Sequence, residues 1–147
     1  MKGTYPALRR ALGNIDMTTD PIGDLINRLS NAGAVKKHTV SVPFSAFKLA
    51  VVEKLKEAGY VQAVEKKGKK VRKSIDVTLK YSEAGEPRIA GVRRVSKPGR
   101  RMYKGVHELR PVKYGHGMLI LSTPQGVKTD AEARKEKVGG EALFEIW

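Results

Sequence analysis

The chain has 147 residues, of which 40% are hydrophobic, and this size suits one domain or two very small ones. Lysine and arginine number 29 against 15 acidic residues, so the formal net charge is +14, which predicts attraction to nucleic acid or another polyanion. The absence of cysteine excludes disulfides and thiolate metal sites, and no apolar run approaches the roughly 20 residues that span a bilayer. An anionic membrane surface would also attract such a chain, but no basic amphipathic helix with exposed aromatic residues supports that partner.

Residues 1–16 carry a few basic residues and lack the apolar block of a secretory signal. We predict an N-terminal extension here. Its role stays open between a basic arm, a targeting segment and residues that precede the true start at Met17. The predicted location of the protein is the cytoplasm.

The first helix is predicted to begin at Asp20-Pro21, because aspartate caps helices and proline is tolerated at the first helical position. The apolar residues that follow have the spacing of one helical face: Ile22, Leu25, Ile26 and Leu29. Gly33 is expected to end the helix, and residues 38–42 are expected to form a short strand.

A second helix is predicted from Ser45 to Gly59, a glycine that suits a helix C-terminus. Its buried stripe is expected to comprise Phe47, Ala50, Val51, Leu55 and Ala58. The residues expected to face water are Lys48, Glu53, Lys54, Lys56 and Glu57. Residues 60–65 and 71–80 are predicted strands, joined across a lysine-rich turn.

The second half begins after residues 82–87, a candidate linker with glycine, glutamate and proline but no apolar periodicity. A strand is predicted over 88–95. A basic segment follows over 97–113, with one helical turn at 106–109. The fully apolar run 118–121 indicates a buried strand.

Thr129, with a glutamate three residues later, has the spacing of a capping box and begins a short helix that ends before Gly139. Residues 142–147 are the terminal strand. Together these elements predict an α+β fold with two units. Residues 17–82 form a unit of two helices and three strands, and residues 83–147 form a small, mostly β unit with one short helix.

A basic cluster occupies residues 66–73, where six residues are lysine or arginine and none is acidic. At a hairpin tip its lysines, including Lys69 and Lys70, could reach phosphates across a groove. They would position a nucleic acid rather than specify its sequence. The alternative is a solvated turn whose lysines keep a sheet edge soluble.

The segment 93–113 is also rich in cations, and a Pro-Gly turn would present Lys97, Arg100 and Arg101. Arginine pairs with phosphate through two parallel hydrogen bonds. Tyr103 could stack on an unpaired base, although the pattern alone favours a core aromatic with its hydroxyl at the surface.

The loop Ser122-Thr123-Pro124-Gln125-Gly126 carries no charge within a cationic chain. Its hydroxyls both donate and accept hydrogen bonds, so they suit 2′-hydroxyls, phosphates or base edges. The proline stiffens the loop, and the glycine permits a positive backbone angle or close approach. The same residue types also make an ordinary turn from strand to helix, and the pattern alone favours that interpretation.

The sequence Gly139-Gly140-Glu141 lies where the last helix returns to the sheet. Two glycines would let a nucleic-acid backbone approach closely. Glu141 would then need hydrogen-bond donors, such as base amino groups or 2′-hydroxyls. The alternative is a helix stop followed by a surface acid.

Several short motifs occur along the chain in a definite order. They are Asp20-Pro21-Ile22-Gly23-Asp24-Leu25-Ile26, Asn31-Ala32, Val42-Pro43-Phe44-Ser45, Lys97-Pro98-Gly99-Arg100-Arg101-Met102-Tyr103, Ser122-Thr123-Pro124-Gln125-Gly126, Ala133-Arg134 and Gly139-Gly140-Glu141. From Met17 to Trp147 this series resembles the family of bacterial small-ribosomal-subunit protein eight. The resemblance implies a ribosomal protein that binds the central domain of small-subunit rRNA directly, aids its assembly and lies among other small-subunit proteins. Members of the family can also bind their own mRNA and repress its translation.

The resemblance also implies which residues contact RNA. They are residues 122–126, Tyr103 and residues 139–141, which makes the second unit the RNA-binding one. Weaker, positioning contacts are implied for the first half at Thr18, Arg28, Asn31 and Lys48, although the residues themselves favour a solvated surface position for each. The chain departs from many members at Pro124, where a polar residue is usual, and at Ser30, where a basic residue is usual.

Two other functions remain open from the sequence. One is a regulatory nucleic-acid-binding protein that never joins the ribosome. The other is a hydrolase or nuclease using His116 and Ser122. Against it, Ser122 lacks the glycine-flanked elbow of such nucleophiles, and no acid is placed to orient His116. We therefore expect no enzyme, no cofactor and no metal site.

Overall fold

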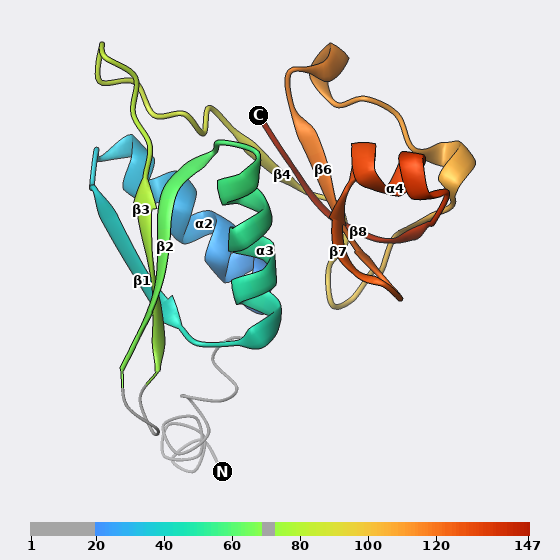
Figure 1. Cartoon of the computed structure of the whole chain (residues 1–147), viewed down its shortest axis with the longest axis horizontal. Coiled ribbons are helices and arrows are strands. Elements are labelled where there is room, and N and C mark those ends of the chain that lie inside the picture. The colour runs from blue at the N-terminus through green and yellow to red at the C-terminus, as the bar shows by residue number, and fades with distance from the viewer. Residues whose placement is uncertain (1–19, 69–72) are drawn as a thin grey trace, which may run out of the picture.

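The structure is a computed structural model that describes residues 20–68 and 73–147 (Figure 1). Helix α2 spans Pro21–Ala34 and begins as predicted, because the Asp20 carboxylate accepts a hydrogen bond of 3.1 Å from the Gly23 amide. The first unit continues with β1 (Thr39–Pro43), α3 (Ala46–Glu57), β2 (Val61–Lys67) and β3 (Ser74–Leu79). The three strands form an antiparallel sheet in the order β1-β3-β2.

The second unit contains a five-stranded antiparallel sheet and one short helix. Its elements are β4 (Val92–Arg94), β5 (Tyr103–Lys104), β6 (Met118–Thr123), β7 (Gly126–Thr129), α4 (Asp130–Glu136) and β8 (Gly140–Ile146). The strand order is β4-β8-β6-β7, and β5 pairs with β8 as well. The predicted α+β fold is therefore confirmed.

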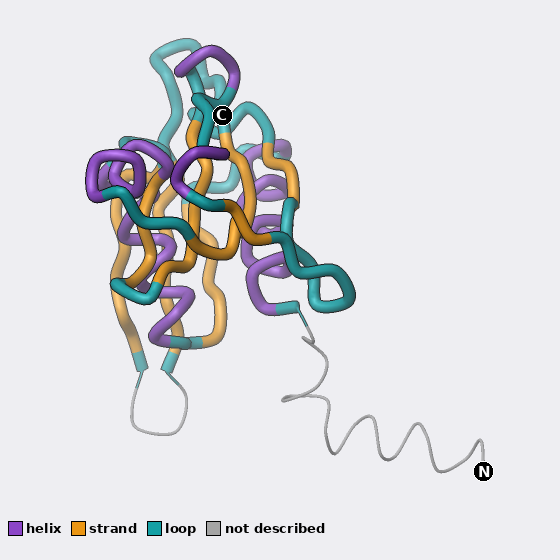
Figure 2. The backbone as a smooth tube through the Cα atoms, turned by 90° about the vertical axis from the view of Figure 1, so that its right-hand side faces the viewer, coloured by secondary structure: helices purple, strands orange, loops and turns teal. Residues whose placement is uncertain are grey.

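The structure has three layers, with the first sheet on one side, the two long helices in the middle and the second sheet on the other side (Figure 1). Helices α2 and α3 lie between the first sheet and the second, and Figure 2 looks onto the second unit with the first behind it. Strand β6 explains the layering, because its side chains alternate between two apolar clusters. Met118 and Ile120 join the large core that includes Leu25 and Val51, whereas Leu119 packs with α4 on the other side.

The large core draws residues from both sheets, so the two units share their buried surface. The predicted boundary after residue 82 stays a prediction. None of the helices within residues 20–68 and 73–147 has both the length and the apolar character needed to cross a bilayer.

The predicted face of α3 was partly wrong. Phe47 is 38% exposed, whereas Lys48 is only 7% exposed, and Val52 is buried with Val51 and Leu55. The buried positions follow one helical face that includes Lys48, so the apolar stripe is rotated by about one residue from the predicted one. A lysine tolerates such a position because its aliphatic stem packs against apolar neighbours.

Several strand boundaries also differ from the prediction. Of the strand predicted over residues 88–95, only β4 forms a strand. The Ala90 and Gly91 amides both donate to the Trp147 carbonyl and therefore do not pair with successive residues of a neighbouring strand. Strands β5 and β7 were not predicted. The last strand begins at Gly140 and therefore includes Glu141.

Candidate nucleic-acid interface

The neutral loop is a tight hairpin turn between β6 and β7. The two strands pair as far as Thr123 and Gly126, so Pro124-Gln125 forms the turn, and the predicted connection from strand to helix is wrong. Gly126 has a φ of 113°, which glycine adopts without strain. The Thr123 hydroxyl donates to the Gly126 carbonyl at 2.7 Å and accepts from the Gln125 amide at 3.1 Å. Thr123 thus holds the turn together.

The surface of the turn is formed by its other residues. Pro124, Gln125 and Gly126 are exposed, and Ser122 is half-buried at the end of β6. Thr123 is only 9% exposed, so its hydroxyl faces inward. Of the two hydroxyl-bearing residues, Ser122 is therefore the more exposed, and the exposed amide side chain of Gln125 belongs to the same turn.

Three predicted contact residues lie in one row across the sheet. Ser122 of β6 is the register partner of Glu141 of β8, and Glu141 is also the register partner of Tyr103 of β5. Residues directly opposite on neighbouring strands share a face, with Cβ atoms about 4.5–5.5 Å apart. Tyr103 is 68% exposed, so its predicted alternative as a core aromatic is wrong. We call Ser122, Glu141 and Tyr103 the cross-strand row.

The structure explains why the two residues before Glu141 are glycines. A Cβ atom on Gly139 would lie 2.5 Å from the Lys104 carbonyl oxygen, and one on Gly140 would clash with the Ser122 carbonyl. The glycines therefore let β8 enter the sheet between its neighbours. Their close approach to RNA stays a prediction.

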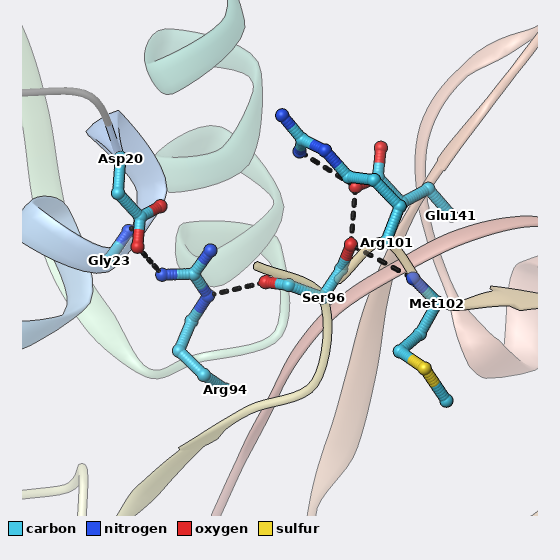
Figure 3. Close-up of polar contacts among 7 residues, drawn as sticks. All are labelled: Asp20, Gly23, Arg94, Ser96, Arg101, Met102 and Glu141. Atoms are coloured by element: carbon cyan, nitrogen blue, oxygen red, sulfur yellow. Dashed lines mark hydrogen bonds and ion pairs between the residues drawn. The ribbon is translucent and has the colours of Figure 1, made fainter. Parts of the chain in front are cut away.

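The Glu141 carboxylate already has donors within the protein (Figure 3). Its Oε2 atom accepts hydrogen bonds from the Ser96 hydroxyl and, at 2.9 Å, from the Arg101 guanidinium. The donors predicted for Glu141 were RNA base amino groups or 2′-hydroxyls, and the sequence did not single out Ser96. No local signal could have done so, because Ser96 and Glu141 are 45 residues apart.

A turn rich in cations lies beside the cross-strand row. Lys97 and Arg100 exchange main-chain hydrogen bonds of 3.0 and 2.9 Å, which closes a turn at Pro98-Gly99. Lys97, Arg100 and Arg101 are exposed and precede Tyr103 by only a few residues. The structure thus brings the predicted cationic residues next to the predicted neutral ones.

Other cations of segment 93–113 are engaged within the protein. Arg93 pairs with Glu145 at 3.2 Å, and the Lys113 ammonium lies 4.4 Å from the centre of the Trp147 ring. Arg94 pairs with Asp20 and also donates to the Ser96 carbonyl at 2.8 Å (Figure 3). These three side chains therefore make contacts within the protein.

The weaker predicted contacts of the first half that the structure describes lie on α2 and α3. Arg28 and Asn31 line a groove of about 380 Å³ between α2 and β1. Arg28 is anchored there by Asp24 at 2.9 Å and by the Ser41 carbonyl at 3.2 Å.

Lys48 is buried rather than exposed, which corrects its predicted placement on the helix surface. Burial lowers the pKa of its ammonium, and the nearby Asp24 carboxylate opposes that shift. The remaining predicted contacts lie outside the described residues: Thr18, Lys69 and Lys70.

The geometry separates the two residues of the hydrolase alternative. His116 precedes β6 and Ser122 lies near its other end, so the two are about 20 Å apart along an extended strand. Such a separation rules out a hydrogen bond between them. In the described part of the chain, no three side chains of histidine, aspartate or glutamate gather as metal ligands do.

Comparisons with known proteins agree with the motifs. A family model described as Ribosomal protein S8 matches residues 20–147. A protein named small ribosomal subunit protein uS8 from Nitratidesulfovibrio vulgaris (strain DP4) is 47% identical over 131 residues, covering 89% of this chain and 100% of that relative. The uS8 proteins of Acidovorax sp. (strain JS42) and Sphingopyxis alaskensis are 46% and 45% identical, covering 85% and 88% of this chain and 95% and 98% of the relatives. The chain therefore belongs to the ribosomal protein S8 family of the small ribosomal subunit.

Proposed function

We propose that this protein binds the central domain of small-subunit rRNA directly and helps that domain to fold during assembly. The observation that carries the proposal is the cross-strand row, in which Ser122, Glu141 and Tyr103 share one face beside a cationic turn. The row offers a hydroxyl, a carboxylate and an aromatic ring, which suit the 2′-hydroxyls and unstacked bases of an irregular RNA helix.

In this mechanism, one set of residues attracts the RNA and another set recognises its shape. Exposed cations such as Lys97 and Arg100 contact phosphates, which fixes the position of the RNA without reading its sequence. The cross-strand row then distinguishes one irregular helix from regular duplex RNA. The family consists of structural ribosomal proteins rather than enzymes, and the proposal includes no chemical turnover.

The protein would then lie in cytoplasmic ribosomes, among neighbouring small-subunit proteins. The same row would also bind a segment of its own mRNA that has the shape of the rRNA helix. Translation would then be repressed when the protein is bound to that mRNA, which competes with rRNA for the same surface.

Salt dependence tests the electrostatic part of the proposal. If roughly 6–10 phosphates are neutralised, affinity falls by about 10³–10⁵ between roughly 50 and 200 mM salt. Titration of a central-domain RNA fragment at several salt concentrations measures the slope. A slope near zero would contradict phosphate binding.

Footprinting on whole small-subunit rRNA tests the partner itself. We expect protection concentrated in one irregular helix of the central domain. Protection spread evenly over many duplexes, or confined to another domain, would overturn the proposal. Co-sedimentation of the endogenous protein with small subunits in high salt separates it from a free regulatory protein.

A further inference from the structure

Ser96 is the most deeply buried polar residue beside the cross-strand row, with only 1% of its surface exposed. Its hydroxyl accepts a hydrogen bond from the Met102 amide at 3.2 Å and donates one to Glu141 Oε2. A serine hydroxyl has a single proton to donate. Because the Met102 amide occupies an acceptor position, the proton is directed at the carboxylate.

The main chain of Ser96 is held as well. Its carbonyl accepts from Arg94 Nε at 2.8 Å, and its amide donates to the Leu143 carbonyl at 3.3 Å. Its hydroxyl, carbonyl and amide are therefore all fixed by neighbours. A group restrained in this way can fix the orientation of the side chain that it contacts.

Arg94 connects this site to the first unit. Its guanidinium pairs with Asp20, the N-terminal capping residue of α2 (Figure 3). Gly23 makes room for it, because a Cβ atom there would clash with the guanidinium nitrogen. Hydrogen bonds thus run from α2 through Arg94 and Ser96 to Glu141.

We propose that Ser96 is a positioning residue that orients the Glu141 carboxylate for RNA, and that Arg94 and Asp20 support it from the first unit. The inference rests on the proposed function and assigns the buried network a role in selectivity. Ser96 itself is too deeply buried to touch RNA. With Oε2 held by Ser96 and Arg101, the other carboxylate oxygen points away from both and can accept from a base amino group or a 2′-hydroxyl (Figure 3).

Arg101 alone cannot keep the Glu141 carboxylate oriented when RNA binds. Its side chain is 51% exposed and lies next to the cationic turn, so an RNA phosphate can compete for it. Ser96 is buried and its partners are fixed, so its hydrogen bond to Glu141 persists when RNA binds.

A double-mutant cycle tests the proposal. The dissociation constant is measured for a central-domain helix fragment and for random duplex RNA, using wild type, Ser96→Ala, Glu141→Ala and the double variant. We expect Ser96→Ala to weaken cognate binding about tenfold and to leave random-duplex binding unchanged. In the Glu141→Ala background, the same substitution should change cognate binding by less than about twofold, because the residue it positions is gone.

Ser82→Ala is the matched control. The Ser82 hydroxyl also accepts a hydrogen bond from a backbone amide, that of Glu86 at 3.1 Å, but it lies on an exposed turn between the units. Cognate affinity should be unchanged in this variant. Thermal unfolding of every variant establishes that binding is measured on folded protein.

Asp20→Asn provides a second variant that keeps the fold. Asparagine caps a helix as well as aspartate does, but it cannot form the ion pair with Arg94. We expect cognate binding about threefold weaker, again only while Glu141 is present. If Ser96→Ala fails to fold, Asp20→Asn replaces it in the double-mutant cycle with Glu141→Ala.

The outcomes separate this inference from the proposed function. Wild-type protein that does not prefer the central-domain helix would overturn both. If the wild type is selective, additive effects of Ser96→Ala and Glu141→Ala on cognate binding would show that Ser96 acts independently of Glu141 and would overturn the positioning role. Wild-type cognate affinity in Ser96→Ala would overturn it too, and wild-type affinity in Asp20→Asn would overturn the support from the first unit.

Discussion

At the scale of single residues, two adjacent hydroxyls at the end of β6 have different surroundings. Thr123 faces inward and bonds the main chain of its own turn, whereas Ser122 lies opposite Glu141 and stays accessible. The sequence pattern predicted both as equivalent contacts. Only the strand register separates them, because successive side chains of a strand point to opposite faces.

Ser122→Ala should therefore reduce selectivity. We expect affinity for the central-domain helix to fall about fivefold, the effect of one neutral hydrogen bond of about 1 kcal/mol, with little change for random duplex RNA. The measurement is the ratio of the two dissociation constants at fixed salt.

Arg100→Ala is the contrasting variant. It removes an exposed cation that we propose contacts a phosphate, so both RNAs should bind more weakly by a similar factor and the salt slope should decrease by about 1. Equal losses for the two RNAs in Ser122→Ala would show that the row does not read RNA shape.

At the scale of secondary structure, helix starts were predicted well because their signals are local. Asp20, Ser45 and Thr129 each accept a hydrogen bond from an amide three residues later. Strands β5 and β7 were missed because their pairing partners lie far along the chain or across an unpredicted turn. The buried place of Lys48 was missed because charge alone suggested a solvent-facing side chain.

Helix α4 offers a test at this scale, since Glu132 has two roles. Its carboxylate accepts from the Thr129 amide at 3.0 Å in the capping box, and it also pairs with Lys54 of α3 at 2.9 Å. Thr129→Ala removes the cap and should lower the free energy of unfolding by about 1 kcal/mol.

Glu132→Gln is the comparison, because glutamine still completes a capping box but loses the ion pair. Solvent screens that partly exposed pair, so we expect a smaller loss of about 0.5 kcal/mol. Equilibrium urea unfolding measures both variants. A larger loss for Glu132→Gln than for Thr129→Ala would show that the contact between helices, rather than the cap, dominates.

At the scale of the whole molecule, two carboxylates connect the units through ion pairs. Burial opposes ionisation of Asp20, but the Arg94 guanidinium and the Gly23 amide outweigh it and hold the pKa of that carboxyl below its ordinary value. Burial likewise opposes ionisation of Glu132, and Lys54 with Thr129 holds its pKa low. These links depended on contacts across the chain that sequence patterns do not reveal.

Acid should therefore destabilise the protein in a definite range. A carboxyl with a lowered folded pKa contributes stability that is fully present above its unfolded pKa, about 4, and is lost as pH falls through the folded value. We expect the unfolding free energy to decrease as pH falls below about 4. Asp20→Asn should make this decrease shallower, and an unchanged pH profile in that variant would exclude the Asp20 pair as a contributor.

The absence of cysteine permits the most direct test of the cross-strand row. A single cysteine introduced as Gln125→Cys, in the exposed turn next to Ser122, can carry a tethered iron probe that cleaves nearby RNA. With whole small-subunit rRNA, we predict cleavage confined to one irregular helix of the central domain, while a probe at Glu83→Cys on the exposed turn between the units cleaves elsewhere or not at all. An intact complex in which the Gln125→Cys probe leaves that helix uncut would contradict the account.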